Sequence, residues 1–336
     1  MNSVPVFVGL DYHQDSVQVC VLDGVGTVLR NASYLNDALT IATVVERHGV
    51  TVRAAIESCT GAANLADELV QRSGWTIDLA HPGFVRRMKQ NPDKTDFADA
   101  HLLADLERLG YLPKVWLAPQ EVRELRRLVR YRQQLVEERR RTKLRISALL
   151  RDQRVRCPFT SSTKGWLTWL ETNKQVSPQS QWILQRQAKR LKELNREVCE
   201  VEEHLACVTQ HDPLVAALQK QKGIGPVTAW TIRAEIGRFD RFRTGKQLAR
   251  FCGLSPCNAS SGKRQADAGL IQAGNRHLRA TLIEAAHRLI RFDDPWKAFS
   301  RKLLERGKPK CVVVTAAANR WMRWLFHHMQ PNKLAA

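Results

Sequence analysis

The chain has 336 residues, of which 43% are hydrophobic, so it is long enough to form more than one domain with a buried core. Its 53 Lys and Arg outnumber its 33 Asp and Glu, and the resulting formal charge of +20 points to a polyanionic partner, above all nucleic acid. No apolar run reaches the roughly 18 to 20 residues of a membrane span, and the N-terminus lacks the pattern of a signal peptide. We therefore expect a cytoplasmic, nucleoid-associated protein with no membrane partner. The eight scattered cysteines form no CxxC pair, which favours reduced thiols over a zinc site.

Short apolar runs that end on carboxylates mark the first sixty residues. Residues 6–10 lead to Asp11, and residues 17–22 alternate well enough to be the hairpin partner of that run. Residues 52–56 form another such run and lead to Glu57. The pattern predicts two strands with Asp11 and Glu57 at their ends.

A second pair of acids follows at the start of a predicted helix. Asp96 and Asp99 are three residues apart, so they share one helix face. Four carboxylates close together repel one another unless a cation neutralises them, and Mg²⁺ prefers such oxygen ligands. A pair of Mg²⁺ ions can serve phosphoryl transfer. We predict a metal site here, the alternative being four unrelated surface acids.

Strand and helix patterns alternate through this part of the chain, which predicts an α/β domain with an RNase H-like sheet. Three early strands are followed by a helix over 38–47, the Glu57 strand, a helix from Ala62, a strand over 76–80 and helices over 86–90 and 95–109. The basic residues 86–89 could hold a phosphate backbone or form a solvated helix face.

The middle of the chain loses its strand patterns and becomes helical. Long amphipathic, arginine-rich patterns over 121–153 and 181–208 flank an insert that contains Pro, Ser and Trp. These patterns predict an antiparallel coiled-coil arm for dimerisation and nucleic-acid binding, or else a charged face on a structural bundle.

The C-terminal third begins with a Gly-Ile-Gly motif between two helical patterns. It predicts a helix-hairpin-helix in which Gly223 and Gly225 expose backbone N–H groups to a phosphate, although a plain turn between helices has the same pattern. A basic loop follows, with Ser260, Ser261, Lys263 and Arg264, and then helical patterns over 275–290 and 309–329. A serine before glycine is usually a loop residue, but beside a phosphoryl-transfer site its hydroxyl could hold a phosphate covalently.

Taken in order, these motifs resemble the DEDD transposases of bacterial insertion sequences, which are bridge-RNA-guided serine recombinases. The motifs are GLD at Asp11, IES at Glu57, KTDxxDA at Asp96 and Asp99, the GIG hairpin, FCGLSP and the SSG loop. The resemblance spans nearly the whole chain. One departure is the segment 319–324, which is richer in tryptophan than expected.

The resemblance implies a multidomain protein with a RuvC-like domain (1–115), a coiled-coil arm with an insert (116–212) and a mainly α transposase domain (213–330). It implies that Asp11, Glu57, Asp96 and Asp99 bind Mg²⁺ and that Ser261 is the nucleophile. It also implies donor and target DNA, a guide (bridge) RNA that pairs with both, and a homodimer or homotetramer. Lys263 and Arg264, with the GIG glycines, are candidate nucleic-acid ligands.

Two other functions remain open from the sequence. A RuvC-type, structure-selective nuclease, such as a Holliday junction resolvase, would use the same acids with water as the nucleophile and would form no covalent adduct. A non-enzymatic nucleic-acid scaffold would bind in a salt-dependent way that Mg²⁺ and the loss of Asp11 leave unchanged.

Overall fold

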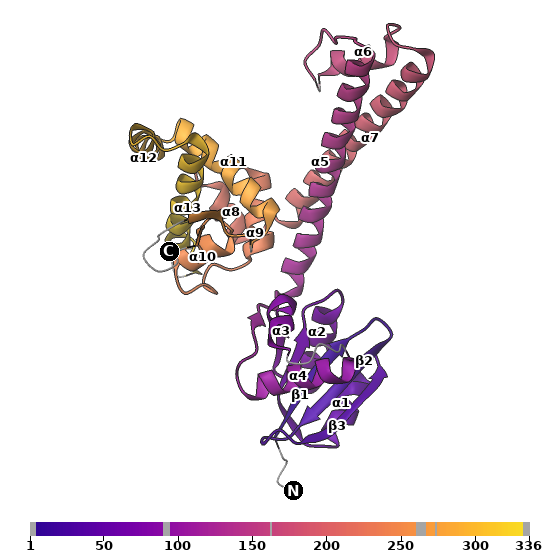
Figure 1. Cartoon of the computed structure of the whole chain (residues 1–336), viewed down its shortest axis with the longest axis vertical. Helices are drawn as coiled ribbons and strands as arrows, with labels where there is room; N and C mark the ends of the chain where they lie inside the picture. The colour runs from indigo at the N-terminus through magenta and orange to yellow at the C-terminus, as the bar shows by residue number, and fades with distance from the viewer. Residues whose placement is uncertain (1–4, 90–94, 162, 260–266, 273, 332–336) are drawn as a thin grey trace. The chain divides into compact units, whose positions relative to one another are not determined.

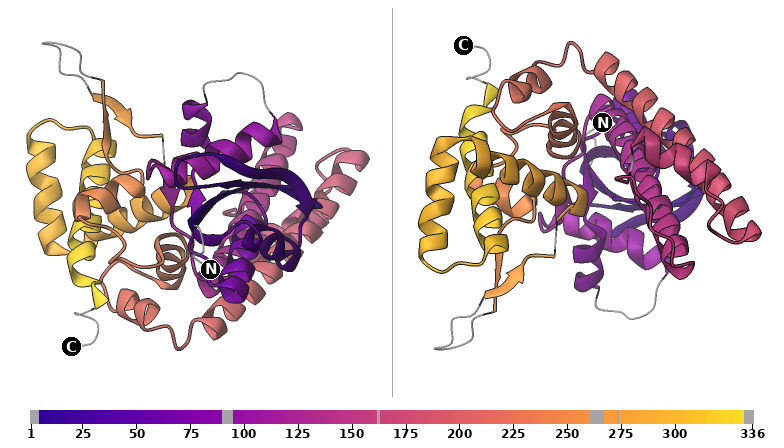
Figure 2. Two further views of the ribbon diagram at one scale, coloured as in Figure 1. Left: turned by 90° about the horizontal axis from the view of Figure 1, so that it is seen from below. Right: turned by 90° about the horizontal axis from the view of Figure 1, so that it is seen from above.

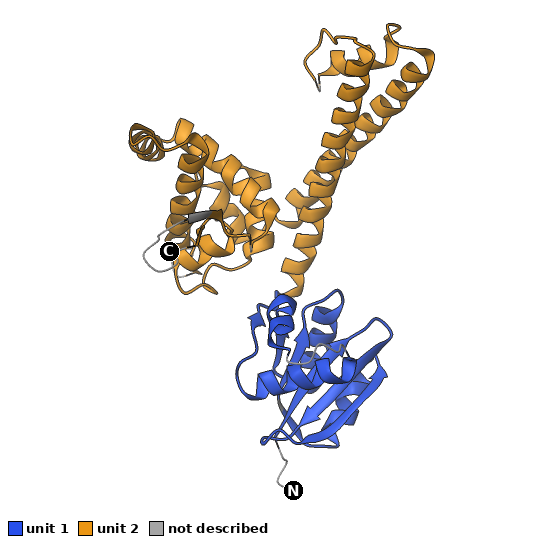
Figure 3. Ribbon diagram, in the orientation of Figure 1, with its two compact units in different colours: residues 1–118 blue, residues 119–336 orange. Residues whose placement is uncertain are grey.

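The computed structural model describes residues 5–89, 95–161, 163–259, 267–272 and 274–331. The chain divides into two compact units, residues 1–118 and residues 119–336 (Figure 3). The expected division into three domains stays a prediction. Within the described residues, no helix has the length and apolar character needed to cross a membrane.

Unit 1 is an α/β domain, as the alternating patterns predict (Figure 1). In chain order its described elements are β1 (Pro5–Tyr12), β2 (Ser16–Leu22), β3 (Val28–Leu35), α1 (Ala38–Glu46), β4 (Val50–Glu57), α2 (Ala62–Ser73), β5 (Ile77–Ala80), α3 (Pro82–Met88), α4 (Asp96–Arg108) and β6 (Lys114–Val115). The strands form a mixed sheet in the order β3-β2-β1-β4-β5-β6. The central strands β1, β4 and β5 are parallel, while β2 runs antiparallel to both of its neighbours.

Both faces of this sheet are covered by helices, as Figure 2 shows. Alternate residues of β1, such as Val8 and Leu10, pack in one core with α1 and α2. The other face meets α4, where Cys20 and Leu22 of β2 pack against Ala100 and Ala104. Because side chains of a strand alternate between faces, the α4 side of β1 carries the positions of Gly9 and Asp11.

The backbone of α4 lies directly on β1 at Gly9. A Cβ atom built on Gly9 would overlap the carbonyl oxygen of Ala100 and lie 2.6 Å from the amide nitrogen of Ala104. Only glycine fits such a close approach of two backbones. This contact fixes the position of α4 along the sheet.

The described residues of unit 2 are helical apart from one short strand pair, in agreement with the helical patterns of the sequence. Its described elements are α5 (Gln120–Asp152), α6 (Lys164–Thr172), α7 (Pro178–Val208), α8 (Pro213–Gln219), α9 (Pro226–Ile236), α10 (Gly245–Phe251), β7 (Pro256–Asn258), β8 (Asp267–Leu270), α11 (Arg276–Phe292), α12 (Asp294–Glu305) and α13 (Lys310–His328).

The helices α5 and α7 pack along each other and form an arm (Figure 1). Leu135 of α5 meets Leu194 and Val198 of α7 in the middle of the arm. At one end, α6 closes the arm with Trp166 and Leu170, which are buried against both long helices. At the other end, α5 and α7 enter the core of the C-terminal helices.

A buried carboxylate holds α5 against α9. The side chain of Glu235 is 5% exposed and accepts hydrogen bonds from Arg130 at 2.9 and 3.0 Å. Arg126 lies 3.7 Å from the same carboxylate and donates to the carbonyl oxygen of Ala234. A buried charge needs such partners, so these arginines are structural and are not free to bind a phosphate.

The structure differs from the expected elements at the start of α3 and in helices that the patterns did not predict. The helix expected over 86–90 begins earlier, since α3 starts at Pro82, where the side chain of His81 accepts from the amide of Gly83. The arm insert contains α6, which begins where Thr163 accepts from the amide of Trp166. The helix α12 has Pro295 in its first turn and was not predicted.

We expect Gly9→Ala to destabilise unit 1, because the added Cβ would push α4 away from the sheet. Overpacking of this kind costs about 1–3 kcal/mol of the free energy of unfolding. Thermal unfolding of the full chain and hydrogen exchange in the peptides of α4 measure the effect.

Gly24→Ala is the matched control, since a Cβ at Gly24 meets nothing within 4 Å. Equal unfolding temperatures and equal exchange in α4 for the two variants would contradict the role given to Gly9.

Candidate metal centre

Two of the predicted acids lie at adjacent strand ends. Because Leu10 pairs with Ile56 in the parallel β1 and β4, Asp11 and Glu57 are the next residues of neighbouring strands. Since side chains alternate along a strand, both residues belong to the face of the sheet that α4 covers. The sheet itself therefore brings two carboxylates together.

The first turn of α4 brings the other two acids. Thr95 caps the helix, and its hydroxyl accepts a hydrogen bond of 3.2 Å from the amide of Ala98. Asp96 and Asp99 occupy the first turn, where the helix dipole favours negative charge. Asp99 is buried and Asp96 is exposed.

Hydrogen bonds hold this turn against the sheet. Gln18, which lies opposite Asp11 in β2, donates to the side-chain oxygen of Asn31 at 2.7 Å. Asn31 in turn donates to the carbonyl oxygen of Phe97 at 3.0 Å. These two side chains connect the strand that faces Asp11 to the start of α4.

The four acids interact electrostatically at Asp11. Burial raises the pKa of Asp11 above its ordinary value, and the neighbouring His13 opposes that shift. The charges of Asp96, Asp99 and Glu57 raise this pKa further. The structure thus brings the other three predicted carboxylates within electrostatic reach of Asp11.

Two cationic or ligand-forming side chains lie in the same cluster. His13 Nε2 is 3.6 Å from Asp11 Oδ2 and 3.3 Å from Asp96 Oδ2. One ligand atom from each of these three residues lies within 4.8 Å of the other two, so they could hold a metal ion. Lys89 Nζ lies 2.5 Å from Asp99 Oδ1.

The sequence analysis did not single out His13, and it considered Lys89 only as part of a basic stretch. The sequence signal for His13 was its position two residues after Asp11, because residues two apart on an extended chain point to the same side. The pairing of Lys89 with Asp99 depends on how α3 and α4 lie, and no local pattern gives it.

The remaining predicted residues belong to unit 2. Gly223 and Gly225 lie in the turn between α8 and α9, with a φ of +82° at Gly223 and with Gly225 at the N-cap of α9. Ser261, Lys263 and Arg264 lie outside the described residues, as does the neighbouring Ser260.

Asp11→Asn is expected to stabilise unit 1 at pH 7 in EDTA. Because folding raises the pKa of Asp11, this carboxyl lowers the free energy of unfolding progressively once the pH exceeds its unfolded pKa, and the cost is complete above its folded pKa. The gain in stability over the wild type should vanish below about pH 3, where Asp11 is protonated in both the folded and the unfolded state. Thermal unfolding from acidic to neutral pH measures it.

Asp23→Asn is the control of opposite sign. Asp23 accepts hydrogen bonds from the amides of Val25, Gly26 and Thr27, which hold its pKa below the ordinary value. This variant should lower the unfolding temperature at pH 7. A lowered temperature for Asp11→Asn at pH 7 would refute the electrostatic cost assigned to Asp11.

Comparisons with known proteins show which family the chain resembles. A family model described as a transposase, of the DEDD type of IS110, matches residues 8–153. The model of the "Transposase IS116/IS110/IS902 family" matches residues 215–301. Together these matches cover the carboxylate cluster and most of the C-terminal helices.

Three curated relatives carry transposase names. The "Probable family 20 transposase" of Pseudomonas aeruginosa is 30% identical over 81% of this chain and 82% of its own length. The transposase for insertion sequence element IS1111A of Coxiella burnetii is 26% identical over 94% of this chain and 88% of its own. The transposase for insertion sequence element IS1328 of Yersinia enterocolitica is 25% identical over 69% of each. The chain belongs to the IS116/IS110/IS902 family of DEDD transposases, enzymes that act on DNA in the transposition of insertion sequences.

Proposed function

We propose that this transposase recombines DNA at a Mg²⁺ site formed by Asp11, Glu57, Asp96 and Asp99. The observation that carries the proposal is the electrostatic coupling of Asp11 to the other three acids, which come from β4 and from the first turn of α4. The order of the central strands supports an RNase H-like, RuvC-like identity for unit 1.

The residues of the cluster fit a hard divalent cation. All four acids offer carboxylate oxygens, and the pKa of Asp11 is raised first by burial and then by the charges of the other three acids. When bound, Mg²⁺ would polarise a phosphate and neutralise charge that develops on its oxygens. Asp11, Glu57 and Asp96 would bind it, with His13 beside them.

Lys89 forms an ion pair with the carboxylate of Asp99 in the structure. Its ammonium group lies against the most buried of the four acids and balances the negative charge of that carboxylate. Binding of a cation at Asp99 would require this lysine to release it, and a DNA phosphate is a suitable acceptor for the released charge.

We further propose that Ser261 is the nucleophile. Ser261 Oγ would bond to a backbone phosphorus while the bond from that phosphorus to a deoxyribose oxygen breaks, so the energy of the phosphoester is kept in the serine link. The hydroxyl proton of the serine would pass to a base or to water, and the released deoxyribose oxygen would take up a proton to become a free hydroxyl. Support comes from the family of the chain and from the position of Ser261 in the sequence between β7 and β8.

The basic arm would bind the nucleic acids. A net charge of +20 suits donor and target DNA together with a guide RNA that supplies sequence recognition by base pairing. The packing of α5 on α7 supports a coiled-coil arm that joins protomers into a dimer or tetramer, since strand exchange needs two active sites. Gly223 and Gly225, with Lys263 and Arg264, are the proposed phosphate contacts.

Asp11→Asn is expected to abolish DNA strand cleavage in Mg²⁺ and to leave DNA affinity within about twofold of the wild type. The substitution removes a metal ligand but no phosphate contact. Cleavage of end-labelled DNA, with guide RNA present, and a parallel binding titration measure both quantities.

Asp23→Asn removes a carboxylate of the same unit outside the cluster and should cleave as the wild type does. Cleavage by Asp11→Asn at the control's rate would exclude Asp11 from the metal site.

Ser261→Ala is expected to abolish recombination and any covalent link between protein and DNA, whereas Ser260→Ala should keep both. The serine-linked species is detected as a protein band that retains labelled DNA under denaturing conditions. Cleavage by Ser261→Ala without an adduct would favour the RuvC-type nuclease, in which water is the nucleophile.

A further inference from the structure

The last helix of the chain, α13, has two different faces. Its buried face is apolar and includes Trp321 and Leu325, which are at most 1% exposed. Its exposed face carries Arg320, Arg323, Trp324 and His327, at the helical spacing i, i+3, i+4 and i+7. This face contributes nothing to the core, so its composition needs another explanation.

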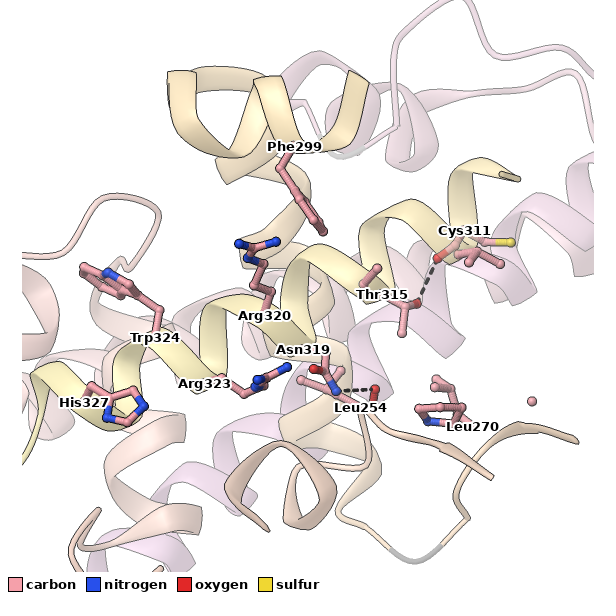
Figure 4. Close-up of a pocket in the computed structure, with 14 residues that line it drawn as sticks. Leu254, Leu270, Phe299, Cys311, Thr315, Asn319, Arg320, Arg323, Trp324 and His327 are labelled. Atoms are coloured by element: carbon pink, nitrogen blue, oxygen red, sulfur yellow. Dashed lines mark hydrogen bonds between the residues drawn. The ribbon is translucent and has the colours of Figure 1, made fainter. Parts of the chain in front are cut away.

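The exposed face of α13 forms one wall of a cavity of about 1100 Å³ (Figure 4). Phe299 of α12 lines it opposite α13, and Leu254 and Leu270 line it on the side of β7 and β8. Asn319 donates a hydrogen bond of 3.1 Å to the carbonyl oxygen of Leu254 and so fixes α13 to that wall. The cavity has apolar surfaces and a few convergent polar groups, as ligand sites do.

The charge of the cavity is positive. Among the residues that the structure describes, those that line it include Arg320, Arg323 and His327 but no Asp or Glu. Neither arginine forms an ion pair with a carboxylate of the residues that the structure describes, and no Asp or Glu follows Glu305 in the sequence. Unpaired guanidinium groups beside a low-dielectric wall attract an anion, and their planar fork suits a phosphate.

Aromatic side chains lie beside these arginines. The Arg320 guanidinium lies over the Phe299 ring, 5.0 Å from its centre. Trp324 stacks on His328 with ring centres 3.7 Å apart and keeps 38% of its surface exposed. A flat aromatic surface next to free phosphate ligands is the arrangement on which unpaired bases stack.

We propose that this cavity binds an unpaired nucleotide of the DNA substrate, with the base against Trp324 and the phosphate on Arg320 and Arg323. The proposal rests on the DNA substrate of the proposed function and adds a specific contact outside the acid cluster. A base in duplex DNA is already stacked on its neighbours, so only an unpaired or extruded base can enter.

The test is binding of the full-length chain to a short, fluorescein-labelled single-stranded oligodeoxythymidine in EDTA. Trp324→Ala should weaken binding by roughly 5- to 150-fold, the range for loss of one stacked base, with an unchanged salt dependence. Arg323→Ala should also weaken binding and lower the slope of log affinity against log salt by about 0.7, the value for one phosphate contact on a single strand.

The controls are an exposed arginine and an exposed aromatic residue. Arg288→Ala removes an exposed arginine of α11, and Phe292→Ala removes an aromatic side chain that is 72% exposed, both outside the cavity. Each should bind close to the wild-type affinity. Trp324→Phe keeps a stacking surface and should restore most of the affinity that Trp324→Ala loses.

Several outcomes would overturn the proposal. Trp324→Ala and Arg323→Ala could bind the oligodeoxythymidine with the same affinity as the two control variants. The two variants could lose as much affinity for duplex DNA as for the single strand. They could also lose affinity only for the matching oligouridine RNA, which would assign the cavity to RNA. Because the measurement needs neither Mg²⁺ nor Ser261, failure of the proposed recombination chemistry would leave its result unchanged.

Discussion

The close contact between α4 and β1 at Gly9 is the constraint on which the acid cluster depends. Without a Cβ at Gly9, the helix backbone can lie against the strand, and Ala100 and Ala104 keep the rest of the contact small. The first turn of α4 then lies at the strand ends that carry Asp11 and Glu57. Packing thus brings the four carboxylates to one place, where burial and then the charges of the other three acids raise the pKa of Asp11.

The two units use their basic residues in different ways. In unit 1, Lys89 is bound to Asp99, and in unit 2 two arginines of α5 surround the buried Glu235. These cations stabilise the protein and subtract from the charge that can meet DNA. The arginines of α13 differ because no described carboxylate accompanies them. Net charge therefore indicates the class of partner, whereas the pairing of individual residues indicates where that partner binds.

The expected elements were most accurate where the hydrophobic period was long and clear. The alternating strands near Asp11 and the long helices of the arm appear close to their predicted bounds. Short elements were missed, including α6, α12 and the pair of β7 and β8. Their residues depend on caps and on tertiary partners more than on a local period, as the threonine cap of α6 illustrates.

The sequence by itself determined the strand ends at Asp11 and Glu57, the helix that begins at Asp96, and the strongly basic character of the chain, because period and charge are local properties. Only the tertiary structure decided that His13 and Lys89 share the acid cluster, since those contacts join separate elements. The same holds for the cavity on α13, where the helical period defines an exposed face but the packing of α12 and the loop at Leu254 turns that face into a site. Contacts between residues far apart in sequence follow from how whole elements pack, and a local pattern does not contain that information.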